Sequence, residues 1–130
     1  MAKLIQFDLV SPEKSLVSVK ANEINIPGSE GDFSAMSDHA PIIAIISTLR
    51  PGFINIFTAD KEEQYFVTGG FAEVSAETTS VLAEKAFTKD DLSRAVADKL
   101  IVDAKLKHEE IGSDATAKYC SDLEVALSDI

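Results

Sequence analysis

The sequence contains few of the residues on which several protein classes depend. It has one cysteine, Cys120, no tryptophan and only two arginines, Arg50 and Arg94. A single cysteine excludes an internal disulfide framework and a thiolate metal site, and this usage fits a reducing compartment. No apolar run reaches the roughly 18 residues that a membrane-spanning helix requires. The most apolar stretch, IIAIISTL at residues 42–49, has the length of a buried strand.

Charge of one sign dominates the sequence. The formal net charge of the 130 residues is −10, which argues against a nucleic-acid partner because phosphate binding needs clustered lysines and arginines. The same charge keeps the chain away from anionic lipid, so we expect its partner to be protein. The first residues lack the long apolar centre of a signal peptide, and we therefore expect the protein to stay in the compartment where it is made.

Turn residues divide the first two thirds of the chain into short strands. Apolar and polar residues alternate within segments that end at Pro, Gly or polar clusters, a pattern typical of antiparallel sheets rather than of βαβ units. We expect strands within residues 4–10, 22–28, 42–48, 53–57, 65–75 and 78–87. Residues 1–87 are therefore predicted to form an antiparallel β-sandwich or barrel.

The hydrophobic period changes to that of a helix after Phe87. Thr88 can cap a first helix, with Asp90 and Asp91 in its first turn. Gly112 can end this helix and Ser113 can cap a second one. Apolar side chains four residues apart mark one face of each predicted helix: Leu92, Val96, Leu100 and Ala104, then Tyr119, Leu123 and Leu127. Residues 88–130 are therefore predicted to form a helical hairpin that docks on the sandwich or on a partner.

The stretch from Gly28 to Ile42 gathers polar side chains without a recognisable catalytic spacing. Ser37, Asp38 and His39 are contiguous, whereas a working triad brings its members from separate parts of a fold. Glu30, Asp32, Asp38 and His39 lack the spacings of zinc or calcium sites, and the glycines lack the ending of a phosphate loop. Two interpretations stay open, a connecting loop and a contact surface. A third hypothesis is a small enzyme or ligand-binding sandwich with this loop as its site.

Four stretches in order carry a family resemblance. They are IPGSEGDFSAMSDHAP at 26–41, LRPG at 49–52, FVTGGFAEVS at 66–75 and VLAEKAF at 81–87. Together they are similar to the epsilon subunit of the F-type ATP synthase. The resemblance implies a flattened sandwich of about ten strands followed by two helices. It also implies a non-catalytic rotor subunit at the foot of the central stalk, bound to the gamma subunit and to the membrane-embedded ring of c subunits.

The resemblance assigns the polar loop to the c-ring. Asp32 falls where relatives carry an acidic residue that touches the ring, and His39 falls in a corner usually written Pro-Gly-His-Ala-Pro. Here Ser37 and Asp38 replace the Pro-Gly pair. The implied ring contacts are Ser29, Glu30, Gly31, Asp32, Ser37, Asp38 and His39. The resemblance implies no catalytic residue, no metal and no required cofactor. We further expect an apolar patch on one sandwich face for gamma.

Many relatives inhibit ATP hydrolysis when their hairpin extends and basic residues of the last helix meet an acidic segment of the beta subunit. In this chain residues 113–130 hold Lys118 against Asp114, Asp122, Glu124 and Asp129, so their formal charge is +1 − 4 = −3. An acidic helix is repelled by an acidic target. We therefore expect inhibition through the beta subunit to be weak or absent, with an inhibitory ATP-sensing subunit as the alternative.

Some relatives bind ATP through the motif D-x-x-R-A, which Asp91, Arg94 and Ala95 match. A helix-surface ion pair is the simpler interpretation, since phosphate sites need converging positive charge and the second helix has no arginine. ATP binding here is therefore expected to be weak. The resemblance and the start at Met1 place the protein peripherally at the cytoplasmic face of a bacterial inner membrane, and a plastid-encoded origin stays open.

Overall fold

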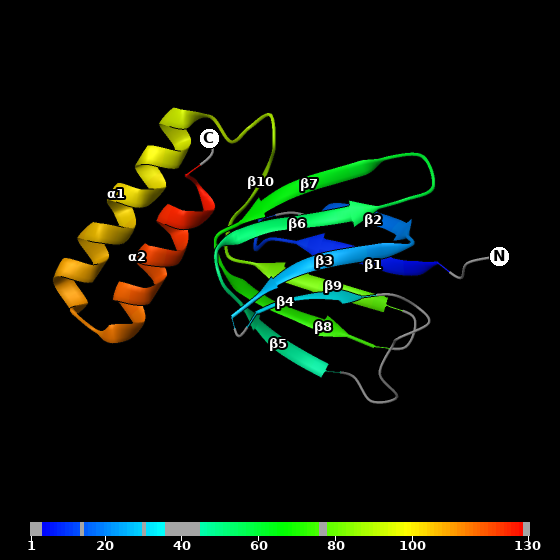
Figure 1. Cartoon of the computed structure of the whole chain (residues 1–130), viewed down its shortest axis with the longest axis horizontal. Coiled ribbons are helices and arrows are strands. Elements are labelled where there is room, and N and C mark those ends of the chain that lie inside the picture. Colours follow the sequence, from blue (N-terminus) through cyan, green and yellow to red (C-terminus); the bar gives the residue numbers. More distant parts are fainter. Residues whose placement is uncertain (1–3, 14, 30, 36–44, 76–77, 129–130) are drawn as a thin grey trace.

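Strands and helices occupy separate parts of the computed structural model (Figure 1). The structure describes residues 4–13, 15–29, 31–35, 45–75 and 78–128, with the side chains of residues 45 and 46 left out. Within these residues ten strands precede two helices. The strands are β1 (Ile5–Val10), β2 (Ser15–Ala21), β3 (Glu23–Gly28), β4 (Gly31–Ala35), β5 (Ile45–Leu49), β6 (Gly52–Phe57), β7 (Glu62–Val67), β8 (Gly70–Val74), β9 (Thr78–Ala83) and β10 (Ala86–Thr88). The helices are α1 (Arg94–Ile111) and α2 (Asp114–Ala126).

The strands form one hydrogen-bonded path that folds into two layers. Its order is β10-β7-β6-β3-β5-β8-β9-β1-β2, and β4 pairs with β3 off this path. Every pairing is antiparallel except that of β1 with β9, which is parallel. β3 joins the layers, because its first three residues pair with β6 while Gly28 pairs with Leu49 of β5. The sequence-based prediction of a sandwich of about ten strands is confirmed.

The alternation of the strands explains the core between the layers. In β1 every second side chain is buried, namely Ile5, Phe7 and Leu9, and Ile54 and Ile56 of β6 repeat the pattern. Each such side chain contributes about 1.5–3 kcal/mol when it leaves water. A shift of either strand by one residue would turn its apolar set toward solvent, so burial fixes the register.

Two strands, β2 and β4, lie in segments where we expected none. We expected the residues of β4 to belong to a loop, and Gly31 and Asp32 are of types that are depleted in strands. β4 forms because its five residues pair with β3 along their whole length. β2 was absent from the expected strands, and it forms by pairing with β1 from Ile5↔Ala21 to Val10↔Ser15. Cross-strand pairing decided both segments.

The helical hairpin is confirmed, with one correction at its start. Ser93, not Thr88, caps α1, because its hydroxyl accepts a hydrogen bond from the Val96 N–H. Thr88 is instead the last residue of β10, and its hydroxyl accepts from the Asp91 N–H in the following turn. Asp90 and Asp91 therefore precede the helix. Gly112 ends α1 at a φ of 64°, and Ser113 caps α2, as the sequence predicted.

A second apolar cluster attaches the hairpin to the sandwich. Its buried members are Phe66, Leu92, Ala97, Leu123 and Leu127. The cluster joins β7 to both helices and to the segment between Thr88 and Arg94. Our expected division at residues 87 and 88 falls inside β10, whose Thr88 pairs with Tyr65 of β7.

Candidate functional site at the turn between β3 and β4

A tight turn joins β3 to β4 at one end of the sandwich. Gly28 and Gly31 are partners in the strand ladder, with two residues between them. A Cβ atom at position 28 would lie 2.5 Å from the Gly31 carbonyl oxygen, so glycine is needed there for space. Gly31 has a φ of 139°, which residues with side chains rarely adopt. The turn therefore needs its first glycine for close approach and its second for backbone conformation.

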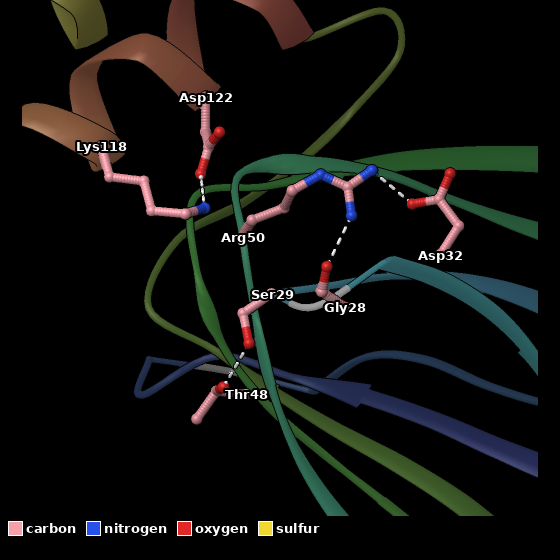
Figure 2. Close-up of polar contacts among 7 residues, drawn as sticks. All are labelled: Gly28, Ser29, Asp32, Thr48, Arg50, Lys118 and Asp122. Carbon is pink, nitrogen blue, oxygen red and sulfur yellow. Dashed lines mark hydrogen bonds and ion pairs between the residues drawn. The ribbon is translucent and has the colours of Figure 1, made fainter. Parts of the chain in front are cut away.

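The Arg50 side chain connects the two arms of this turn (Figure 2). Its Nη1 donates to the Gly28 carbonyl oxygen at 2.6 Å, and its Nη2 donates to Asp32 Oδ1. A guanidinium suits this place because its planar fork serves two acceptors at once. The ion pair alone contributes only about 0–1 kcal/mol, since the side chains are 30% and 71% exposed. Its main effect is on the geometry of the turn.

Strand β5 holds the turn from its other side. The Ser29 N–H donates to the Thr48 carbonyl oxygen at 2.9 Å, and the two hydroxyl oxygens lie 2.7 Å apart. The Arg50 N–H donates to the Pro27 carbonyl oxygen at 3.0 Å. Figure 2 shows the contacts of the Arg50 side chain with Gly28 and Asp32 and the contact between the Ser29 and Thr48 hydroxyls. The turn is therefore held by backbone and side-chain hydrogen bonds together.

The structure brings together three of the residues that the sequence singled out as ring contacts. Ser29, Gly31 and Asp32 share the turn, whereas Glu30, Ser37, Asp38 and His39 lie outside the described residues. The prediction of one continuous loop over residues 28–41 is wrong for Gly31–Ala35, which form β4. From its first to its last residue this strand spans about 13 Å. Arg50 and Thr48, which sequence reasoning did not place here, complete the site.

The chemistry of the turn suits recognition rather than catalysis. The Ser29 hydroxyl faces the Thr48 hydroxyl, which is not a base, and the Asp32 carboxylate faces Arg50. Among the described residues no group of three or more His, Cys, Asp or Glu side chains is placed to hold a metal ion. The turn therefore offers hydroxyls, one paired carboxylate and backbone groups to a partner.

A groove of about 1130 Å³ lies between the hairpin and the sandwich, next to this turn. Thr48 contributes to both, because it lines the groove and also contacts Ser29. Phe71 and Leu82 line the groove with 43% and 47% of their surfaces exposed. These two residues are partners in the β8–β9 ladder, and Leu82 is also the partner of Val10 in β1. We call Val10, Phe71 and Leu82 the outer apolar row.

Tyr119 of α2 reaches from the hairpin into the same groove. Burial raises the pKa of its phenol, and the nearby Glu84 carboxylate raises it further, while a hydrogen bond with Thr68 acts in the opposite direction. Thr68 is itself 3% exposed. The phenol is therefore held in its neutral form where the two parts of the molecule meet.

Arg94 of the D-x-x-R-A motif contacts other groups of the hairpin, and ATP binding there stays a prediction. Arg94 pairs with Asp98 at 3.0 Å, and its Nη1 donates to the Leu127 carbonyl oxygen at 3.4 Å. Asp91 precedes α1, so the expectation that it lies in the first turn of this helix is wrong. Ala95 is exposed on the first turn of α1. Arg94 also lines a groove of about 410 Å³. The charged side chains of its lining are two cations, Arg94 and Lys105, and two anions, Asp98 and Glu124, so their charges balance.

The described residues form two helices, α1 and α2. Neither is long and apolar enough to cross a membrane.

Comparison with known proteins shows which family shares this architecture. Residues 4–89 match the family model described as the beta-sandwich domain of the ATP synthase delta/epsilon chain. The ATP synthase epsilon chain of Rhodobacter capsulatus is 46% identical, over 100% of this chain and 98% of the relative. That of Fuscovulum blasticum is also 46% identical, over 95% of this chain and 94% of the relative.

Solved structures share the fold at low sequence identity. A chain of the mitochondrial ATP synthase of Euglena gracilis superposes with a TM-score of 0.67 at 19% identity, covering 93% of this chain and 75% of that one. A chain of the central stalk and c-ring of the Tetrahymena thermophila mitochondrial ATP synthase gives 0.55 at 16% identity, covering 69% and 70%. These likenesses support the fold alone.

Proposed function

The chain belongs to the family of ATP synthase epsilon chains, and from this membership we propose that it is a non-catalytic rotor subunit. It transmits rotation between the ring of c subunits and the catalytic head, and it binds the gamma subunit. The observation that carries this proposal is the turn between β3 and β4, because it presents polar groups in a fixed shape without the parts of a catalytic site. A closely packed sandwich resists deformation and suits the transmission of torque.

The turn is the proposed contact with the polar loops of the c-ring. Ser29, Gly31 and Asp32 lie on it, and Asp32 keeps 71% of its side-chain surface exposed beside Arg50. Glu30, Ser37, Asp38 and His39 stay predictions for the same contact. Exposed charge pairs add only about 0–1 kcal/mol each, so shape and hydrogen bonds must contribute most of the specificity.

The outer apolar row is the proposed contact with gamma. Phe71 and Leu82 are neighbours across two strands and together leave an apolar surface uncovered. Interfaces that persist bury such surfaces at their centre, with aromatic residues enriched there. The row lies on strands of the sandwich and lines the groove beside the hairpin, so the hairpin borders the proposed contact.

Inhibition through the beta subunit is proposed to be weak or absent. The one lysine of α2, Lys118, is paired with Asp122 at 2.9 Å, and Glu124 is paired with Lys105 of α1 at 3.1 Å. An extended helix would therefore meet an acidic target with acidic side chains of its own. We further propose a peripheral position at the cytoplasmic face of a bacterial inner membrane, and no required cofactor.

Reconstitution of an ATP synthase depleted of its epsilon subunit tests the proposal. The full chain is expected to restore ATP-driven proton pumping. Phe71→Asp is expected to weaken binding to gamma by about tenfold or more, because it places a charge in an apolar contact. Val125→Asp is the matched control, since Val125 is 72% exposed on α2 and lies outside the row. Equal binding by both variants would exclude the outer apolar row as the gamma contact.

The role of the hairpin is tested with a chain that ends at Lys89 and so keeps β10. An ATP synthase reconstituted with this shortened chain is expected to hydrolyse ATP at the rate found with the full chain. A several-fold increase in hydrolysis would show that the hairpin inhibits despite its acidic last helix, and would favour the regulatory alternative.

A further inference from the structure

Asp32 meets solvent as part of an ion pair. Its carboxylate accepts from Arg50, whose guanidinium also holds the Gly28 carbonyl oxygen at 2.6 Å. Gly28 is the last residue of β3 and Asp32 is the second residue of β4. The Arg50 side chain, which comes from outside β3 and β4, therefore fixes the separation of these two arms of the turn. The same side chain neutralises the Asp32 carboxylate.

We propose that Arg50 is a positioning residue for ring binding, which holds the turn between β3 and β4 in the shape that the partner meets. The inference rests on the proposed function, in which this turn contacts the c-ring. Arg50 acts through the turn and through Asp32, since its own side chain is only 30% exposed. This positioning role predicts that the ring meets a preformed surface rather than a free Asp32 carboxylate.

The backbone of Arg50 is itself held in place. Its N–H donates to the Pro27 carbonyl oxygen at 3.0 Å. Pro51 follows it, and a residue before proline is confined largely to extended conformations. Pro51 is also buried, which anchors the next position. The guanidinium is therefore carried by a restrained stretch of chain, as a positioning group must be.

Lysine is not expected to replace Arg50 fully. An ammonium is a compact charge on a long flexible stem, whereas the guanidinium presents a rigid planar fork to two acceptors. A lysine at position 50 reaches one acceptor well and leaves the other to water. The other contacts from this side, namely the hydroxyl pair of Ser29 and Thr48 and the backbone hydrogen bonds of Ser29 and Arg50, restrain only the first arm of the turn.

Binding measurements on the full-length chain test the inference. The probes are an epsilon-depleted complex that contains gamma and the c-ring, and a soluble catalytic head with gamma but without the ring. Arg50→Ala is expected to weaken binding to the complex with the ring by roughly tenfold, because the turn must then be ordered on binding. Binding to the complex without the ring is expected to stay unchanged. Arg50→Lys is expected to recover part of the loss.

The opposite result overturns the inference. If the ring attracts a free carboxylate, Arg50→Ala releases Asp32 and binding to the complex with the ring becomes tighter. Unchanged binding would also contradict a positioning role. If Arg50→Ala fails to fold, Arg50→Lys decides the question alone, with a loss of about threefold expected and wild-type affinity as the contrary outcome.

Lys61→Ala is the matched control. It removes an ion pair between Lys61, in the turn between β6 and β7, and Glu63 of β7, whose charged atoms lie 2.6 Å apart. The pairing of Glu23 with Phe57 puts that turn at the opposite end of β3 from Gly28. The affinity of the Lys61→Ala chain for both complexes is expected to equal that of the wild type. A loss equal to that of Arg50→Ala would indicate a general effect of charge.

Hydrogen exchange reports directly on the order of the turn in the free chain, which a binding affinity does not. In the free chain, Arg50→Ala is expected to speed exchange of the Ser29 amide, which donates to Thr48, while the strands β8 and β9 keep their protection. Unchanged exchange at Ser29 would contradict the inference.

Ser29→Arg separates the inference from the function on which it rests. A bulky side chain on the turn should block the ring in any case. If it leaves ring-dependent binding intact, the turn is not the ring contact and the proposed function fails there. If Ser29→Arg weakens binding and Arg50→Ala does not, only the positioning role is wrong.

Discussion

Phe53 and Phe66 meet edge to face where the helical hairpin rests on the sandwich. Their ring centroids lie 5.1 Å apart and their planes are inclined at 63°, an arrangement that aromatic quadrupoles favour. The two residues are partners in the β6–β7 ladder. Phe66 is fully buried and packs in one cluster with Leu123 and Leu127 of the hairpin. Apolar packing at this aromatic pair therefore holds the hairpin in place.

Leu123→Ala is expected to release the hairpin while the sandwich stays folded. Leu123 is 1% exposed in the cluster with Phe66, and a buried Leu→Ala change costs about 2–5 kcal/mol. Hydrogen exchange of the α2 amides checks this, with protection expected to fall there and to persist in β1. Val125→Ala is the control, because Val125 is 72% exposed on the same helix. Equal protection in the two variants would mean that the cluster does not hold the hairpin.

Thr79→Val is expected to stabilise the protein by about 1 kcal/mol. Thr79 is fully buried in β9, and among the described residues its hydroxyl finds no hydrogen-bond partner. A buried hydroxyl without a partner costs free energy, and valine has nearly the same shape. Urea unfolding measures the change. Thr68→Val is the contrasting variant, because the Thr68 hydroxyl donates to the Lys85 carbonyl oxygen at 3.5 Å and its loss should destabilise. A destabilised Thr79→Val would refute the assignment.

Alkaline pH is expected to weaken the attachment of the hairpin through Tyr119. Its pKa is raised, first by burial and then by the Glu84 carboxylate, so the neutral phenol is favoured in the docked state. The stabilisation is complete below the ordinary tyrosine pKa of about 10 and is lost as the pH rises through the raised value. Hydrogen exchange of α2 from about pH 9 to about pH 11 follows the loss, after correction for the intrinsic rate.

Tyr119→Phe is expected to remove this pH dependence of α2 protection. The other tyrosine, Tyr65, lies in β7 and also has a raised pKa, caused by burial and then by Glu63. Tyr65→Phe is therefore the control, and it should leave the response of the hairpin unchanged. If Tyr119→Phe keeps the same response, another group causes it.

Gly70→Ala is expected to destabilise the sandwich by at least about 3 kcal/mol. Gly70 has a φ of 133°, and an added Cβ would lie 2.0 Å from the Leu82 carbonyl oxygen. Backbone strain and collision with a neighbouring strand therefore act together. Gly31→Ala separates them, since its φ is 139° but no atom of the described chain lies within 4 Å of the added Cβ. It should cost only about 1–2 kcal/mol. Thermal unfolding of both variants measures the difference.

Much of the fold follows from local patterns that the sequence carries by itself. The alternation in β1 and β6 marked their buried faces, and Gly112 and Ser113 marked the junction of the helices. These features depend on neighbours in the chain, namely the two-residue period of a strand and the hydrogen bonds of a cap. Thr88 misled the prediction because a threonine also suits a strand end. Its pairing with Tyr65 decided between the two.

The order of motifs along the chain determined the family, and the sequence also supplied the acidic charge of the last helix and the candidate turn residues Ser29, Gly31 and Asp32. Only the tertiary structure decided how that turn is held. Arg50 is 18 residues from Asp32, and the β3–β5 pairing brings the two together. The same holds for β4, whose composition favours a loop until β3 provides its hydrogen bonds. Contacts between distant segments have no local signature, because they arise when burial and strand pairing fix the register of the whole sandwich.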